Sequence, residues 1–287
     1  MRIDEGVLAD RKTKGPKLYA KEVLPDGPPC ALIGVVHGYA DHGARYAHVM
    51  EYLAEHDIGS VAIDLRGHGR AEGVRGHVDE FVEYTDDIAE LAARLEQVAT
   101  RAGATDVPRV LYGHSMGGVA TFHAALRARA GTWDALAHTD PFFGLGLEVP
   151  WIKRAAANLA VKVYPKLAIP TGLAGKDLTH DAAIAQKYEA DPLVFKTATA
   201  GWFTQVLAAQ KEALTRAPEM KLPYWVCHGG ADPIAKLAAT RAVFERAGSS
   251  HKEWVDAPGL LHEVFNEPEW RPLVDQLIAF TKSLPKR

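Results

Sequence analysis

The segment Gly113–Gly118, which reads Gly-His-Ser-Met-Gly-Gly, carries the strongest chemical signal in this chain. It follows the apolar run Val110–Tyr112 and precedes a helical pattern over Val119–Ala130. Glycines two residues before and after Ser115 let a strand and a helix approach each other while the serine occupies a strained turn between them. The hydroxyl is then exposed near a helix N-terminus, where negative charge is stabilised. The pattern predicts a nucleophilic serine; a glycine-rich turn without chemistry is the alternative.

A serine nucleophile needs a base that removes its proton and a carboxylate that orients the base. In one known chain order, the acid and then the histidine follow the serine. Asp232 comes after the predicted strand Tyr224–Cys227, at the carboxyl end of the sheet, where open α/β folds place their sites. His262 lies in a loop after the last predicted strand. We therefore predict a triad of Ser115, Asp232 and His262.

Four other residues compete for the acid and base roles. Asp140 follows the predicted strand Ala135–His138 and also satisfies the chain order, so it stays open as an alternative acid. Asp256 is too close in the chain to the predicted base. His251 precedes the last strand, which puts it at the wrong end of the sheet, and His228 fits a structural role at a strand end.

The negative charge that develops when a serine attacks a carbonyl must be met by two backbone N–H groups. We predict that one comes from Met116, the residue after the nucleophile. We predict that the other comes from Tyr39, in the loop after the strand Ala31–Val36. Because this role needs only the amide of Tyr39, its ring is expected to serve elsewhere, for example in a pocket wall.

The elements that must position these residues alternate between short β-rich runs and longer helical patterns. This alternation indicates βα units around a mostly parallel sheet with helices on both faces. Several strands are continuous apolar runs, as expected when both faces of a sheet are covered. Strands are predicted at Leu18–Leu24, Ala31–Val36, Ser60–Asp64, Arg109–Tyr112, Ala135–His138, Tyr224–Cys227 and Glu253–Val255. Further helices are predicted at Arg45–Glu55, Phe81–Val98, Leu237–Arg246 and Trp270–Ser283.

The alternation lapses in residues 141–218, which contain no good strand candidate. We predict an α/β core made of residues 1–140 and 219–287, with residues 141–218 inserted as an all-helical cap, or lid. Within it, Trp151–Val163 places most of its apolar residues on one half of a helix. Such a helix packs on its own domain or forms a mobile lid that meets lipid. The sequence thus leaves open a transient contact between the cap and a membrane surface.

Composition excludes several other classes of protein. The 287 residues carry 33 Lys and Arg against 36 Asp and Glu, a net charge of −3, which is too even for nucleic-acid binding by phosphate neutralisation. Two cysteines give neither a disulfide framework nor a thiolate metal site. The zinc motif H-E-x-x-H and a complete G-x-G-x-x-G are absent from the sequence, so we expect no metal and no cofactor.

Without a secretory leader or a long apolar run, the chain is expected to be cytoplasmic, and peripheral contact with membranes is left open.

Five segments together resemble the monoacylglycerol lipase and lysophospholipase-type serine hydrolases of the α/β-hydrolase fold. They are His37–Tyr46, Asp64–Arg70, Gly113–Gly118, Ala190–Val194 and His262–Pro268. The resemblance covers about residues 30–120 and 185–270 and fades over Phe122–Thr179. It implies the α/β-hydrolase fold and a lipid ester as substrate.

The resemblance also assigns roles to residues by position. It implies the triad and the two oxyanion amides predicted above, and it adds polar contacts to the glycerol end of a substrate from Asp41, Arg45 and His114. For Arg45, a salt bridge at a helix start is the alternative. Two departures bear on the substrate: Tyr39 is bulkier than the small or aliphatic residue common there, and Asp140 replaces an uncharged residue at the cap entrance.

The predicted function is therefore a cofactor-free serine ester hydrolase that cleaves monoacylglycerol-like or lysophospholipid-like esters through an acyl-enzyme. A short-chain carboxylesterase and a non-catalytic ligand-binding protein of the same fold are the alternatives. An amide or thioester substrate also stays open.

Overall fold

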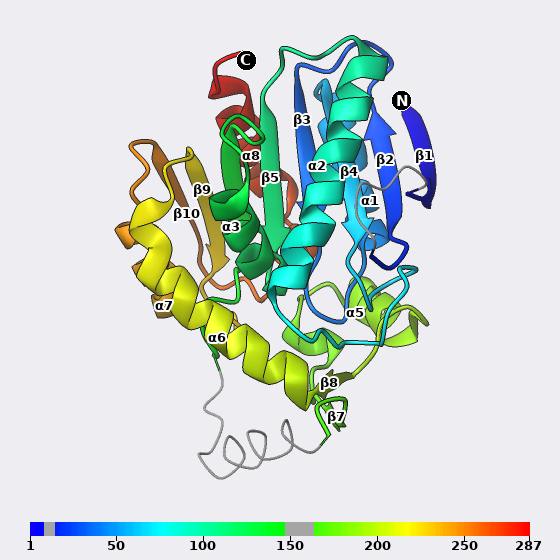
Figure 1. The fold of residues 1–287 in the computed structure, drawn as a ribbon, viewed down its shortest axis with the longest axis vertical. Helices are drawn as coiled ribbons and strands as arrows, with labels where there is room; N and C mark the ends of the chain where they lie inside the picture. The colour runs from blue at the N-terminus through cyan, green and yellow to red at the C-terminus, as the bar shows by residue number, and fades with distance from the viewer. Residues whose placement is uncertain (9–14, 147–163) are drawn as a thin grey trace.

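The structure is a computed structural model that describes residues 1–8, 15–146 and 164–287 (Figure 1). Its main strands are β1 (Arg2–Val7), β2 (Tyr19–Leu24), β3 (Ala31–Val36), β4 (Ile58–Asp64), β5 (Arg109–His114), β6 (Ala135–Thr139), β9 (Tyr224–Gly229) and β10 (Lys252–Ala257). They form one eight-stranded sheet in the order β1-β2-β4-β3-β5-β6-β9-β10. The pairs β1–β2 and β2–β4 are antiparallel, and every other neighbouring pair is parallel.

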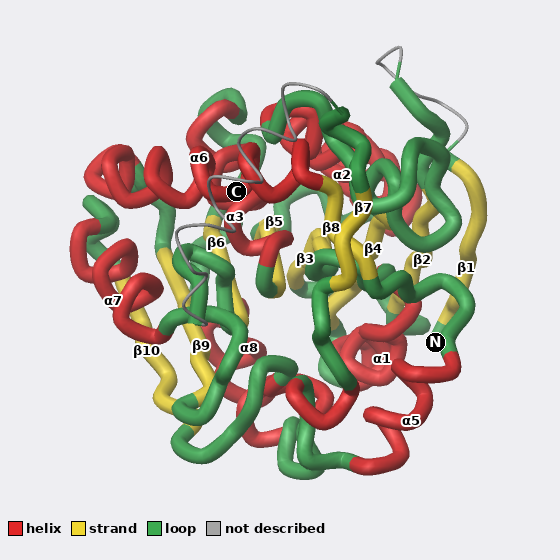
Figure 2. Tube along the Cα trace, turned by 90° about the horizontal axis from the view of Figure 1, so that it is seen from below, coloured by secondary structure: helices red, strands yellow, loops and turns green. Residues whose placement is uncertain are grey.

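Helices cover both faces of this sheet (Figure 2). They are α1 (Ala47–Glu55), α2 (Val82–Ala102), α3 (Met116–Arg127), α6 (Ala200–Arg216), α7 (Leu237–Arg246) and α8 (Arg271–Ser283). A further helix, α5 (Ala182–Ala190), belongs to residues 141–218. One buried cluster joins the sheet to α2, α3, α6 and α7, and a second joins it to α1 and α8. Because β3 and β4 lie between these two cores, all of their residues are buried, which explains why their sequences are mostly apolar and do not alternate.

The predicted fold class is confirmed. All seven predicted strands are present in the sheet, and the predicted helix Leu237–Arg246 has the bounds of α7. The strand β1 was not predicted. Five of its six residues are exposed, so this edge strand lacks the apolar pattern that identifies a strand in a sequence.

The prediction that residues 141–218 are all-helical is wrong in one respect. The segment contains a two-stranded antiparallel sheet, in which β7 (Ala168–Pro170) pairs with β8 (Thr197–Thr199). Three-residue strands are too short for an alternating pattern, and every residue of β7 is exposed. Together with α5, this small sheet lies below the main sheet in Figure 1. The predicted helix Trp151–Val163 lies outside the described residues.

The loop after β3 and the start of α3 touch backbone to backbone. A Cβ built on Gly117 would lie 2.4 Å from the carbonyl oxygen of His37 and 2.5 Å from that of Val36. The glycine is therefore required because no side chain fits between the two segments. This contact brings the end of β3 beside the turn that follows β5.

We predict that Gly117→Ala lowers the free energy of unfolding by about 1–3 kcal/mol, since the backbone atoms that it meets cannot move aside cheaply. Gly27→Ala is the matched control, because a Cβ there meets nothing within 4 Å. Its effect should stay within about 0.5 kcal/mol in chemical denaturation. Equal stabilities of the two variants would contradict the close approach.

Candidate active site

Ser115 occupies the sharp turn between β5 and α3. Its backbone has φ 52° and ψ −121°, a conformation that residues other than glycine rarely adopt. Backbone hydrogen bonds hold the turn in place: the Ser115 amide donates to the Thr139 carbonyl at 3.2 Å, and the Ser115 carbonyl accepts from Gly118 and Phe142, each at 2.9 Å. The strain predicted for this serine is thus present, and the end of β6 helps to fix it.

The imidazole of His262 lies between Ser115 and Asp232. Its Nε2 is 2.9 Å from the Ser115 Oγ, and its Nδ1 is 2.8 Å from the Asp232 Oδ2. Because a carboxylate can only accept, the Nδ1–H donates to Asp232, which leaves Nε2 free to accept the serine proton. His262 and Ser115 are only 4% and 7% exposed. The structure therefore brings together the three residues predicted from their chain order.

The Asp232 carboxyl is held as an anion. Burial alone would raise its pKa, but the electrostatic interaction with His262, the hydrogen bond from its ring and two backbone amides lower the pKa below its ordinary value. Those amides belong to Ile234 and Ala235, which donate to Oδ1 at 2.7 and 3.0 Å. One carboxylate oxygen thus faces the backbone and the other faces the imidazole.

Asp140, the alternative acid, is a fully buried neighbour of this triad. Its Oδ1 accepts a hydrogen bond from the Gly229 amide at 2.7 Å, whereas the ring of His262 bonds to Asp232 instead. Among the described residues, Asp140, Asp232 and His262 form the one group of potential metal ligands whose atoms lie within 4.8 Å of one another. Burial and then the charge of Asp232 raise the pKa of the Asp140 carboxyl well above its ordinary value. The geometry favours Asp232 as the acid.

The other three competitors make contacts away from the serine. His251 pairs with Glu253, and Asp256 accepts from Arg241. His228 lies at the end of β9, where its ring nitrogen bonds to a neighbouring carbonyl. Its position agrees with the structural role predicted for it.

The two amides predicted for the oxyanion flank the serine. Met116 is the first residue of α3, and the loop that carries Tyr39 packs directly on the nucleophile. A Cβ built on Gly38 would lie 3.2 Å from the Cβ of Ser115 and 3.7 Å from its Oγ. Among the hydrogen bonds of the described residues, neither the Tyr39 nor the Met116 amide is a donor, so both are available to a ligand.

The ring of Tyr39 ties this loop to the inserted segment. It stacks on Trp202 of α6 with ring centroids 3.6 Å apart, and its hydroxyl donates to the Gly76 carbonyl at 2.8 Å. Trp202 in turn donates from Nε1 to the sulfur of Met116 at 3.2 Å. An aromatic contact thus joins both residues of the predicted oxyanion hole, a role beyond the pocket wall that the sequence suggested.

Asp41 and Arg45 lie together in a buried ion-pair cluster with Glu263, a residue not predicted to take part in the site. The feature of the sequence that could have identified Glu263 is its position directly after His262, the predicted base. His114 lies elsewhere, with its ring 4.8 Å from that of His262 and its Nδ1 3.0 Å from the Thr139 Oγ1. Burial, and then the nearby His262, lowers the pKa of His114 to about 4, so it is neutral at physiological pH. The predicted contacts of these residues with substrate stay predictions.

The fold and the Ser–His–Asp arrangement define a serine hydrolase of the α/β-hydrolase class. The chain belongs to the family described as "Serine aminopeptidase, S33", whose model matches residues 27–269. In the described ranges, no helix combines the length and the apolar composition needed to cross a membrane.

Curated relatives and solved structures confirm the resemblance. The chain is 30% identical over 260 residues to a monoacylglycerol lipase of Mycolicibacterium smegmatis, and the aligned region covers 90% of each protein. It is 27% identical over 258 residues to phospholipase YtpA of Bacillus subtilis, covering 88% of this chain and 95% of that protein. A crystal structure of a monoacylglycerol lipase from Paleococcus ferrophilus matches with a TM-score of 0.79 at 26% identity, over 92% of this chain and 99% of that one.

We predict that Asp140→Asn stabilises the protein, and that the gain grows between pH 4 and pH 8. An unfolded Asp loses its proton near pH ~3.9. Above that pH, Asp140 is ionised in the unfolded chain, so folding must either protonate the carboxylate or bury its charge. The free energy that this step costs rises with pH until the pH reaches the raised pKa of the folded state. Asparagine carries no such cost. Melting temperatures measured across this range test the prediction.

Asp140→Ala is the matched control. It also removes the titrating group but loses the hydrogen bond from Gly229. Relative to wild type, the melting temperature of Asp140→Ala should change with pH as that of Asp140→Asn does, but it should be lower than that of Asp140→Asn at every pH. A stability gain for Asp140→Asn that shrinks as the pH rises would contradict the account.

Proposed function

We propose that this chain hydrolyses the ester bond of monoacylglycerol-like or lysophospholipid-like lipids through a covalent acyl-enzyme. The observation that carries the proposal is the single imidazole of His262, hydrogen-bonded to Ser115 on one side and to Asp232 on the other. Relatives named monoacylglycerol lipase and phospholipase support the class of substrate.

The first half of the reaction acylates the serine. As the Ser115 Oγ attacks the ester carbonyl carbon, His262 Nε2 takes the serine proton and Asp232 stabilises the imidazolium. The amides of Tyr39 and Met116 donate to the oxyanion of the tetrahedral intermediate, and each such donor is typically worth roughly 3–4 kcal/mol. The intermediate then collapses: its bond to the alcohol oxygen breaks, and His262 gives that oxygen the proton.

The second half releases the acid. Water attacks the carbonyl carbon of the acyl-enzyme while His262 takes one of its protons. When the bond to Ser115 breaks, His262 returns this proton to the serine oxygen, and the fatty acid leaves. The triad is regenerated, and no cofactor takes part in any step.

The surroundings of the oxyanion amides are aromatic. Phe195, in the inserted segment, packs edge-on against Tyr39 at a centroid distance of 5.4 Å, and Trp202 stacks on the same ring. Apolar rings suit the acyl chain of a lipid. Because these bulky rings pack against the loop that contacts Ser115, they also favour the second candidate, a carboxylesterase of short-chain esters.

At the polar end of the substrate, His114, Asp41 and Arg45 are the residues that the family resemblance assigns to glycerol. His114 is the best placed of the three, since its ring lies beside that of His262. Asp41 and Arg45 already hold one another and a second carboxylate, so a substrate hydroxyl would have to compete for them.

We predict that Ser115→Ala lowers kcat/KM by about 10⁴-fold or more, because the nucleophile is lost. The loss should appear on both 1-monooleoylglycerol and p-nitrophenyl acetate, and the wild-type enzyme should prefer the former. Ser60→Ala is the control, since Ser60 is a buried serine of β4 whose hydroxyl has no hydrogen bond in the described structure. A sharp wild-type optimum at acetate would favour the short-chain esterase, and activity that survives Ser115→Ala would refute the proposal.

In this proposal, residues 141–218 form the cap, and its β7 edge touches the lipid surface that holds the substrate. Three large apolar side chains are exposed close together here: Tyr164, Leu167 and Ile169 are 60%, 41% and 47% exposed. Inserting Leu and Ile side chains into a lipid interface stabilises binding by roughly 1.5–3 kcal/mol each.

We predict that the double variant Leu167→Asp/Ile169→Asp binds at least about tenfold more weakly to vesicles of phosphatidylcholine with phosphatidylglycerol. Turnover of p-nitrophenyl butyrate should not change, because both side chains are exposed on the surface of the inserted segment. Ile3→Asp is the matched control, since Ile3 is 49% exposed on β1. Co-sedimentation measures the binding, and equal binding of all three proteins would contradict contact through β7.

A further inference from the structure

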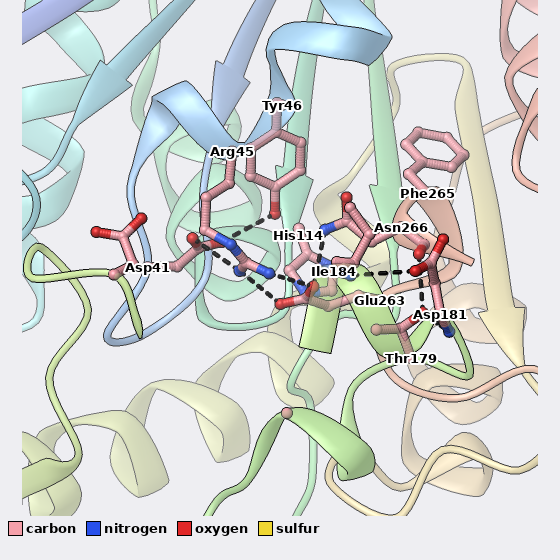
Figure 3. Close-up of polar contacts among 12 residues, drawn as sticks. Asp41, Arg45, Tyr46, His114, Thr179, Asp181, Ile184, Glu263, Phe265 and Asn266 are labelled. Carbon is pink, nitrogen blue, oxygen red and sulfur yellow. Dashed lines mark hydrogen bonds and ion pairs between the residues drawn. The ribbon is translucent and has the colours of Figure 1, made fainter. Parts of the chain in front are cut away.

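The guanidinium of Arg45 sits between two buried carboxylates (Figure 3). Its Nη1 donates to Asp41 Oδ1 at 3.0 Å and to Glu263 Oε1 at 2.7 Å, and its Nη2 donates to Glu263 Oε2 at 2.6 Å. The pair with Glu263 is therefore bidentate, the strongest geometry available to these groups. The side chains of Arg45, Asp41 and Glu263 are only 10%, 5% and 6% exposed.

The two carboxylates come from the two loops that the proposed mechanism needs. Asp41 is two residues after Tyr39, whose amide is a proposed oxyanion donor. Glu263 directly follows His262, the proposed base. Arg45 belongs to a short 3-10 helix, Gly43–Tyr46, that leads into α1. One cation thus ties the oxyanion loop to the histidine loop.

Each carboxylate is held by further donors. Asp41 accepts from the His42 amide at 2.7 Å and from the Tyr46 hydroxyl at 3.3 Å. Glu263 accepts from the Asn266 side chain at 2.7 Å, and its amide donates to the Leu178 carbonyl at 2.8 Å. Both acids are thus bonded to residues next to them in their own loops, so a displacement of Arg45 would be transmitted to the loops.

The inserted segment also reaches this cluster. The ring of Tyr188, on α5, lies 5.0 Å from the Arg45 guanidinium carbon, a cation–π distance. Tyr188 is 4% exposed, so its ring covers the cluster from the side of the insertion. Arg45 therefore contacts three parts of the chain whose relative positions define the site.

We infer that Arg45 and Glu263 form a positioning pair that sets the distance between His262 and the oxyanion amide of Tyr39. The inference rests on the proposed function. It differs from the role that the family resemblance gives to Arg45, because a positioning residue acts on every ester, whereas a substrate contact acts only on esters that carry glycerol. Two carboxylates already engage both of its terminal nitrogens.

The two roles are separated by a pair of substrates with one acyl group, monobutyroylglycerol and ethyl butyrate. A misplacement of about 1 Å at a reacting centre costs up to about 100-fold in rate. We therefore expect Arg45→Met and Glu263→Gln to lower kcat about 10- to 100-fold by the same factor on both esters, with KM within about twofold of wild type. Arg45→Lys, which keeps the charge but not the bidentate geometry, should recover only part of the loss.

The double variant Arg45→Met/Glu263→Gln should be no slower than Arg45→Met alone, since the two groups act as one pair. Arg241→Met is the matched control, because Arg241 pairs with Asp256 at the exposed edge of the sheet. Its kcat should be that of wild type on both esters. All rates are measured well below the melting temperature of each variant, and Glu263→Gln and Arg45→Lys carry the test if Arg45→Met does not fold.

A loss confined to monobutyroylglycerol, or seen only in KM, would make Arg45 a substrate contact and overturn the inference. So would variants that melt at a lower temperature yet keep wild-type kcat on both esters, since the cluster would then serve stability alone. If the wild-type protein hydrolyses neither ester nor monooleoylglycerol, the proposed function fails, and that result is distinct from the others.

Discussion

The proposed chemistry depends on one hydrogen-bonded imidazole. His262 can accept a proton from Ser115 only while Asp232 holds its Nδ1–H, because the other tautomer would present a donor to the serine. The carboxylate is in turn kept ionised and oriented by the amides of Ile234 and Ala235. In the proposed mechanism, this chain of hydrogen bonds, from the backbone through Asp232 and His262 to Ser115, is what makes the serine reactive.

The sheet brings these groups together from distant parts of the chain. The serine follows β5, the acid follows β9 and the histidine follows β10, so parallel pairing delivers all three to one end of the sheet. Loops at that end still have to be placed to within a fraction of an ångström. Two sets of buried contacts position these loops: the stacking of Tyr39 on Trp202, and the ion pairs of Arg45 with Asp41 and Glu263.

Sequence reasoning worked where local chemistry dictates structure. The strand-turn-helix around Ser115 and the chain order of acid and base identified three side chains that lie in contact. The sequence did not predict very short strands or contacts between residues that are far apart in the chain. The strands β7 and β8 have three residues each, too few for a pattern. Neither Glu263 as a partner of Arg45, 218 positions away, nor the closeness of Asp140 to Asp232 could be found without the fold.

The most direct measurement is the mass of the peptide that contains Ser115 after reaction with a fluorophosphonate. Such a reagent is attacked by an activated serine and forms a stable adduct with it. We expect one adduct per chain, on Ser115, and labelling that becomes far slower in His262→Ala. An adduct on another residue, or labelling at the same rate without the imidazole, would contradict the central claim.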